Sequence, residues 1–166
     1  MLFRLVSYLN FLRYSTNQHD VHSPFVYNFV IKCLYSKPRE SKKKLLDVAL
    51  KTIKYFNFKS ILIEKNESLK NELIKHYPKL SLGDRRSDLI YLQGPSLNDL
   101  SFMLFNKQIH NDTMLIVDDI HKNKENKRAW NTIIKLPEIT VSINLFHCGV
   151  LFFRKEQMKE HFTIRI

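Results

Sequence analysis

The sequence Met114-Leu115-Ile116-Val117-Asp118-Asp119 is a short, continuously apolar run that ends in two carboxylates. An uninterrupted apolar run of this length is typical of a strand that is buried on both faces of a sheet. Two runs with the same pattern lie upstream, at residues 60–63 and 88–92. The three runs predict the central strands of a parallel sheet that is covered by helices on both faces.

Segments with helical spacing alternate with these strands, at residues 67–77, 96–108 and 125–136. Ser96 is the expected N-cap of the helix at residues 96–108, and Trp130 is expected to pack the helix at residues 125–136 onto the sheet. Two further apolar runs, 139–146 and 149–153, are separated only by a short turn, whereas a parallel crossover needs about a dozen residues or more. They predict an antiparallel hairpin at the end of a mostly parallel α/β sheet.

The first 57 residues predict three helices that pack on an α/β domain of residues 58–166, so that the whole chain forms one structural unit. The first helix carries apolar residues at helical spacing and is expected to cover a core. Ser23 and Pro24 predict the start of a second helix that runs to about Tyr35. Ser41 is the expected N-cap of a third helix, whose apolar stripe consists of Leu46, Ala49, Leu50 and Ile53.

The chain is strongly basic, with 27 Lys and Arg against 16 Asp and Glu and a formal net charge of +11. Such a balance favours polyanionic partners, such as nucleic acid, or an anionic membrane surface, although a basic surface can also serve solubility alone. The candidate basic helical face consists of Lys42, Lys43, Lys44, Lys51 and Lys54, together with Arg4, Arg13, Arg85 and Arg86. A homodimer that covers an exposed edge strand is a further alternative.

Cysteine usage and the N-terminal residues point to a reducing cytoplasm. Cys33 and Cys148 lie far apart in apolar runs, without spacing that suits a metal or redox pair, so we expect buried, inert thiols. The first fifteen residues are apolar but are interrupted by Arg4 and Arg13, which predicts neither a signal peptide nor a membrane span.

Four segments resemble strands of the class I, Rossmann-like S-adenosylmethionine-dependent methyltransferases, in particular a small bacterial O-methyltransferase-like group. Residues 58–62, 88–94, 114–120 and 149–155 are similar to the start of strand one, strand four, strand five and the last strand, and residues 22–27 are similar to the helical lead-in. The resemblance implies a Rossmann-like methyltransferase sheet, S-adenosylmethionine as cofactor, and methyl transfer to an oxygen or nitrogen nucleophile. It also implies cofactor-binding roles for Glu64 and Gln93.

The sequence departs from this family at the site of the methyl donor. Family members place a glycine-rich turn after strand one, where backbone amides approach the cofactor. Here the residues are Ile63-Glu64-Lys65-Asn66, as if strand one ran directly into strand two, and residues 78–87 are too few for a full third strand. Gln93 stands where metal-dependent relatives carry an aspartate, so no metal is expected. The chain therefore predicts a shortened sheet with lost or weakened cofactor binding.

The candidate catalytic residues are Asp118, Asp119 and His121, because the carboxyl ends of central strands are where α/β sheets bind ligands. An aspartate after a buried strand can equally cap the next loop, and Glu64 can be an ordinary solvent-facing acid. The side chains of His19, Asp20 and His22 are of types that bind metals, but their irregular spacing before a capped helix favours capping.

Overall fold

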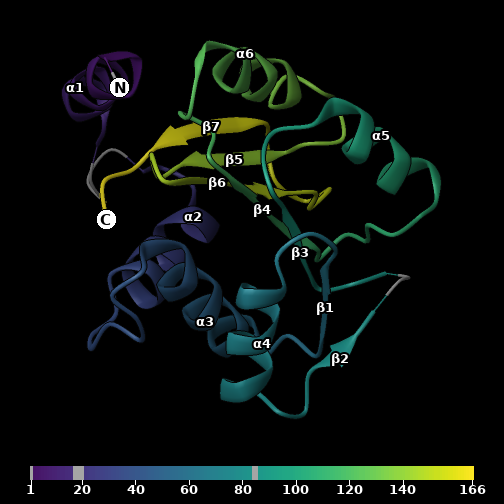
Figure 1. Ribbon diagram of the computed structural model, residues 1–166. Coiled ribbons are helices and arrows are strands. Elements are labelled where there is room, and N and C mark those ends of the chain that lie inside the picture. Colours follow the sequence, from purple (N-terminus) through teal and green to yellow (C-terminus); the bar gives the residue numbers. More distant parts are fainter. Residues whose placement is uncertain (1, 17–20, 84–85) are drawn as a thin grey trace.

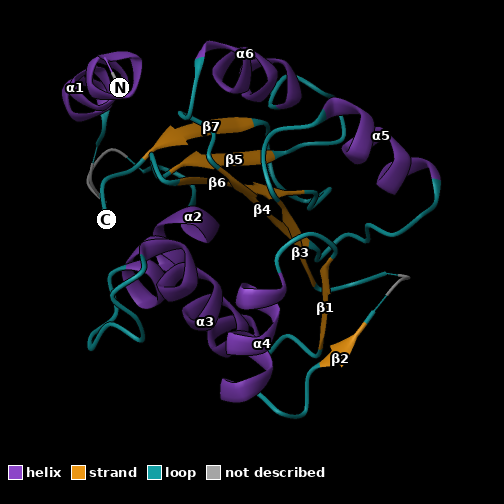
Figure 2. Cartoon of the chain, in the orientation of Figure 1, coloured by secondary structure: helices purple, strands orange, loops and turns teal. Residues whose placement is uncertain are grey.

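A seven-stranded sheet lies between two layers of helices in the computed structural model, which describes residues 2–16, 21–83 and 86–166 (Figure 1). Its strand order is β2-β1-β3-β4-β6-β5-β7. The strands are β1 (Ser60–Ile63), β2 (Ser81–Leu82), β3 (Leu89–Leu92), β4 (Met114–Asp118), β5 (Val141–Asn144), β6 (Cys148–Phe152) and β7 (Glu160–Thr163). Figure 2 shows these strands in orange, with the helices on either side of the sheet and β2 at its lower right margin.

The pairing of the strands confirms the predicted mixture of directions. β1, β3 and β4 pair in parallel, as do β1 and the two-residue strand β2. β6 runs antiparallel to both of its neighbours, β4 and β5. The turn between β5 and β6 is too short for a crossover, which is why the two strands form a hairpin. Among the described residues of the segment 78–87, only Ser81 and Leu82, which form β2 and are exposed, belong to a strand, in agreement with the expectation that no full strand fits there.

The helices follow the sequence pattern closely. They are α1 (Leu2–Tyr14), α2 (Pro24–Phe29), a π-helical segment (Val30–Leu34), α3 (Lys44–Phe56), α4 (Glu67–His76), α5 (Leu97–Phe105) and α6 (Lys124–Ile133). The side chains of Ser23 and Ser96 accept hydrogen bonds from the backbone N–H groups of Val26 and Asp99, which confirms both predicted N-caps. Each bond satisfies a donor that the first helical turn leaves unpaired.

Two apolar cores lie on opposite faces of the sheet. Met114 and Ile116 of β4 join the core that α2, α3 and α4 cover, whereas Leu115 and Val117 join the core beneath α5 and α6. Successive side chains of a strand point to opposite faces, so a continuously apolar strand supplies both cores. The first core also unites Phe29 from the leading helices with strands of the sheet. Figure 1 shows the two helical layers.

Trp130 packs α6 onto the sheet as predicted, and only 4% of its surface is exposed. Its ring lies directly over Gly149 in β6, where a Cβ atom would stand 2.3 Å from a ring carbon. Glycine is therefore required at this position for α6 to approach the sheet closely.

Helix α1 does not cover the core, contrary to the expectation from its apolar stripe. Only Ser7 and Phe11 of this helix are buried, and Leu2, Leu5 and Leu9 are more than half exposed. Phe11 packs against Phe146 with ring centroids 5.4 Å apart. The side of α1 that contacts the protein is thus the side opposite its leucines, and helical periodicity alone cannot distinguish these two placements.

Ser41 does not cap α3, which begins three residues later, after Lys43. The hydroxyl of Ser41 instead accepts a hydrogen bond from the Lys43 backbone N–H. The carboxylate of Asp47 accepts hydrogen bonds from the backbone N–H groups of Glu40 and Ser41 and holds this stretch outside the helix. The predicted apolar stripe of α3 is confirmed, because Leu46, Ala49, Leu50 and Ile53 are all buried.

Strand β7 is an addition that the sequence pattern did not indicate. It pairs in parallel with β5 and forms one edge of the sheet, and the bridge from Ile164 to Thr16 ties down the end of α1. The sequence of β7 is Glu160-His161-Phe162-Thr163, which is not an apolar run, and none of its four residues is fully buried.

Cys33 and Cys148 are both buried, as expected, and burial raises the pKa of each thiol to about 12. None of the helices in the described part of the chain is long and apolar enough to cross a membrane.

Candidate functional site

The strand order places a topological switch point between β1 and β3. These two strands are parallel neighbours, but the chain leaves β1 through α4 toward β2 on one side and leaves β3 through α5 toward β4 on the other. The two helices cover opposite faces of the sheet, so the loops that follow β1 and β3 diverge. Open α/β sheets bind ligands in the crevice that forms at such a point, beyond the carboxyl ends of the strands.

A pocket of about 380 Å³ occupies this crevice. This volume lies in the range of small-molecule sites. The loop after β1, the end of β3 with its following loop, and the start of α6 form its walls. The lining residues are Glu64, Lys65, Tyr91, Leu92, Gln93, Gly94, Pro95, Ser96, Asp99, Lys122, Asn123 and Asn126. Glu64 and Gln93, which lie 29 positions apart in the chain, are therefore brought to one pocket.

The turn from β1 into α4 consists of Glu64, Lys65 and Asn66, each with a side chain. The side-chain oxygen of Asn66 accepts a hydrogen bond of 3.0 Å from the Leu69 N–H and caps α4. Its amide nitrogen donates to the hydroxyl of Tyr91, 3.1 Å away. The turn is thus closed by side-chain hydrogen bonds, and it carries side chains where a glycine turn would leave backbone amides open to a ligand.

Asp118 lies at the end of β4 but does not line the pocket. One of its carboxylate oxygens accepts a hydrogen bond of 3.0 Å from the Tyr91 hydroxyl, and the other accepts one of 2.8 Å from the Asp119 N–H. Burial raises the pKa of Asp118 above its ordinary value, although the Tyr91 hydroxyl opposes that shift. Burial likewise raises the pKa of Tyr91 to about 12, so the phenol stays protonated and continues to donate.

Asp119 turns the chain from β4 toward α6 with a left-handed backbone, at φ 51°. Aspartate is among the residues that tolerate this conformation best. Its carboxylate lies 3.4 Å from the Lys122 ammonium, and its backbone oxygen accepts a hydrogen bond from the Asn126 side chain. Lys122 and Asn126 both line the pocket, so Asp119 positions two lining residues without lining the pocket itself.

His121 is buried away from the pocket and is only 6% exposed. Its ring stacks on Phe146, with centroids 4.9 Å apart, and its Nε2 lies 3.2 Å from the side-chain oxygen of Asn144. Burial lowers the pKa of His121, which keeps the ring neutral at pH 7. The structure therefore separates His121 from Glu64 and Gln93, and the catalytic role of the three candidates stays a prediction.

No group of three or more His, Cys, Asp or Glu side chains in residues 2–16, 21–83 and 86–166 could hold a metal ion. Of the three residues before α2 whose side chains are of metal-binding types, His22 is exposed, and His19 and Asp20 lie outside the described residues.

Sequence reasoning missed Tyr91 and the parts of the site that come from the loop between β4 and α6. Tyr91 belongs to the apolar strand β3, and the apolar pattern of a strand says nothing about the partner of a tyrosine hydroxyl. Lys122 and Asn126 lie next to the candidate carboxylates, and the N-cap at Asn123 was the one local signal that a helix would start there.

A comparison with known proteins found no matching family model, no similar curated protein and no similar solved structure.

Proposed function

We propose that this chain is an S-adenosylmethionine-dependent methyltransferase-like protein in which binding of the methyl donor is lost or weakened. The observation that carries the proposal is the pocket at the switch point between β1 and β3, which has Glu64 on its wall and no glycine in the turn before α4. The sequence resemblance supplies the class of ligand. The mostly parallel sheet with its antiparallel β6 supports the resemblance without identifying the family.

The pocket suits one half of the donor and not the other. Glu64 is a suitable acceptor for ribose hydroxyls, because a carboxylate there can take two hydrogen bonds. The methionine half carries a sulfonium charge and needs close backbone contacts, but the turn offers the side chains of Lys65 and Asn66. The cation of Lys65 also opposes a positive ligand.

The carboxylates after β4 do not present a free base to this pocket. Both oxygens of Asp118 accept hydrogen bonds, and Asp119 pairs with Lys122. The proposed function is therefore residual nucleoside binding without a methyl-transfer step.

Calorimetric titration with S-adenosylmethionine, S-adenosylhomocysteine and adenosine tests the proposal. We expect adenosine and S-adenosylhomocysteine to bind with equal, weak affinity, because the amino-acid half finds no partners. A dissociation constant near 1 μM for S-adenosylmethionine, or about 8 kcal/mol of binding free energy, would show an intact donor site and overturn the proposal. If none of the three compounds gives binding heat, the pocket does not bind a nucleoside.

Substitution of Glu64 sharpens the same experiment. Glu64→Ala should abolish adenosine binding, because it removes the acceptor for the ribose. Glu67→Ala is the matched control, since Glu67 is an exposed acid three residues later that does not line the pocket. Equal affinity of the two variants would place the nucleoside elsewhere.

The second candidate is a non-catalytic basic module that binds RNA or the ribosome, and the net charge of +11 favours it. Lys42 and Lys43 of the candidate basic face are exposed and form no ion pair among the described residues, and Arg4, Arg13 and Arg86 are exposed as well. Lys51 is buried against Asp47, Lys54 pairs with Glu40, and Arg85 lies outside the described residues. Charge reversal at Lys42 and Lys43 should then weaken salt-sensitive RNA binding, measured by filter retention, and unchanged binding would exclude this face.

A further inference from the structure

Helix α1 carries an apolar face that no other part of the described structure covers. This leucine face consists of Leu2, Leu5, Val6 and Leu9, which are 76%, 56%, 48% and 57% exposed. Their spacing of i, i+3, i+4 and i+7 places them on one side of the helix. Burial of apolar side chains is the main favourable term in association, and contiguous exposed apolar surface is typical of a binding site.

The opposite side of α1 holds the helix on the protein. The ring centroid of Phe146 lies 5.4 Å from that of Phe11 and 4.8 Å from that of Tyr8. The bridge between Thr16 and Ile164 fixes the chain just beyond the helix. Figure 1 shows α1 at the margin of the molecule. The leucine face is therefore held outward by contacts that the helix makes on its other side.

The charge on α1 is entirely positive. Arg4 and Arg13 are exposed and form no ion pair among the described residues, and residues 2–16 contain no Asp or Glu. Arg13 lies four residues after Leu9 and therefore on the same side of the helix. Its guanidinium lies 5.6 Å from the centroid of the Tyr14 ring, which leaves the charge uncompensated. The leucine face thus ends in a cation without a carboxylate partner.

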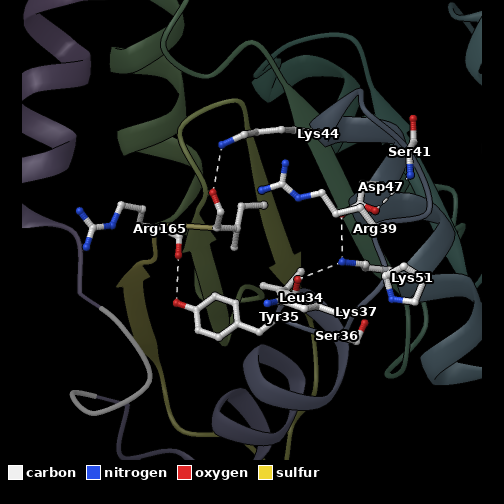
Figure 3. A pocket seen from close by; sticks show the side chains of 12 residues that line it. Leu34, Tyr35, Ser36, Lys37, Arg39, Ser41, Lys44, Asp47, Lys51 and Arg165 are labelled. Atoms are coloured by element: carbon white, nitrogen blue, oxygen red, sulfur yellow. Dashed lines mark hydrogen bonds and ion pairs between the residues drawn. The ribbon is translucent and has the colours of Figure 1, made fainter.

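A third arginine lies beside the end of α1. The backbone N–H of Arg165 donates a hydrogen bond of 3.4 Å to the carbonyl oxygen of Thr16, two residues beyond the helix. Arg165 is exposed, and Figure 3 shows its guanidinium pointing away from the other labelled side chains. It adds to the positive potential that the net charge of +11 creates around this end of the helix.

Charge distinguishes the partners that an exposed apolar helix face binds. A second copy of the chain also carries +11, and contact between two leucine faces would bury Arg13 with no acid from either helix. RNA stacks on aromatic side chains and would leave the aliphatic face exposed to water. An anionic lipid bilayer matches both features, because its acyl chains accept apolar side chains and its phosphates pair with arginine.

We propose that α1 docks the protein on the surface of an anionic lipid bilayer, with the leucine face among the acyl chains and Arg13 at the lipid phosphates. The 13 residues of α1 extend only about 20 Å, less than the hydrocarbon thickness of about 30 Å, so the helix lies in the membrane plane. The long side chain of arginine reaches the phosphates while its stem follows the leucines. The docking surface is independent of the proposed function, because no residue of α1 lines the switch-point pocket.

Flotation of the intact chain with lipid vesicles tests the docking. We expect binding to vesicles of phosphatidylcholine mixed with phosphatidylglycerol, and at least roughly tenfold weaker binding to phosphatidylcholine alone, because each basic residue near an anionic surface contributes a factor of about five. Added salt should weaken the binding. Failure to bind the mixed vesicles, or equal binding to both kinds, would overturn the proposal.

Two variants that each replace two exposed apolar side chains locate the contact. L5Q/L9Q should bind the mixed vesicles roughly tenfold or more weakly, because both leucines are more than half exposed and available for burial. F102Q/F105Q is the matched control on α5, where Phe102 and Phe105 are 60% and 87% exposed, and it should bind like the native chain. Equal losses in the two variants would refute docking through α1.

Circular dichroism spectra establish that both variants fold. If L5Q/L9Q fails to fold, R13Q carries the test and should lose about fivefold of the affinity for the mixed vesicles. An unchanged affinity in R13Q would then refute the proposal. Sedimentation equilibrium without lipid should show a monomer, and a dimer that L5Q/L9Q dissociates would assign the leucine face to a second copy and overturn the proposal.

A fluorescent label reports which helix enters the bilayer. Cys33 and Cys148 are buried, so a thiol added at the surface reacts selectively. An environment-sensitive dye on L9C should shift its emission to shorter wavelength with the mixed vesicles, whereas the same dye on S101C, at an exposed position of α5, should not. A shift at neither position, or an equal shift at both, would overturn the proposal.

Discussion

Replacement of Gly149 by alanine should destabilise the protein, because the added Cβ would overlap the ring of Trp130. The new atom would stand 2.3, 2.4 and 2.9 Å from three ring carbons, all closer than the 3.0 Å that real Cβ contacts respect. The backbone of Gly149 is not in the left-handed region, so alanine itself is compatible with the strand. The entire cost therefore comes from the contact between β6 and α6.

The size of the effect follows from how little the ring can move. Trp130 is 4% exposed and lies between α6 and the sheet, within the core that also holds Ile133 and Leu151. Overpacking a tight core costs about 1–3 kcal/mol, and a rigid indole places this position at the upper end, about 3 kcal/mol. For a domain of this length, that loss corresponds to a Tm lower by about 6–12 °C.

Urea denaturation followed by circular dichroism measures this cost in two backgrounds. With Trp130→Leu the ring is gone, and Gly149→Ala should then cost less than about 0.5 kcal/mol, which gives a coupling energy of more than about 2 kcal/mol. A cost that is the same in both backgrounds, or below about 0.5 kcal/mol in the native one, would refute ring overlap as the reason for glycine.

Buried titratable groups give three further predictions. Burial lowers the pKa of His121, so the unfolded chain binds its proton more readily and folding stability falls as the pH drops below about 6.5. His121→Phe should make the fall of the urea midpoint between pH 7 and 5 shallower, with the remaining slope due to His147 and His161, whose pKa values burial also lowers; an unchanged slope would contradict this. Lys51→Met should lower the free energy of unfolding in urea by about 3 kcal/mol, because it leaves the buried carboxylate of Asp47 without its cation. Lys54→Met, which removes an exposed ion pair of 3.6 Å with Glu40, should lower it by less than about 0.5 kcal/mol, and similar losses in the two variants would contradict an effect of burial. Because burial raises the pKa of the Cys33 and Cys148 thiols to about 12, Ellman's reagent at pH 8 should label neither in the folded protein and both in urea, and rapid native labelling would disprove their burial.

The strands and the caps were predictable because their signals are local. An apolar run without alternation requires burial on both faces, and β1, β3 and β4 confirm this. The hydroxyls of Ser23 and Ser96 cap helices for reasons contained in four residues. Ser41 shows the limit of such signals, because its hydroxyl accepts a hydrogen bond from the Lys43 N–H while α3 begins only at Lys44.

The candidate site was predictable only as far as the edge of the sheet. Residues at the carboxyl ends of parallel strands lie at one edge, so Glu64 and Gln93 meet there. Asp118 ends a strand at this same edge, but the hydroxyl of Tyr91 engages its carboxylate. The spacing of apolar residues cannot predict this hydrogen bond, because Tyr91 and Asp118 lie 27 positions apart and meet only through the pairing of β3 with β4.

By itself, the sequence determined the α/β class, the parallel centre of the sheet, the closing hairpin and the burial of both thiols, because each rests on composition and spacing within a short segment. Only the tertiary structure decided that α1 turns its leucines outward, that β7 forms an edge of the sheet, and that Arg165 lies beside the end of α1. Those arrangements depend on which surfaces meet across long stretches of chain. Long-range packing sets that choice, and the local pattern permits more than one answer.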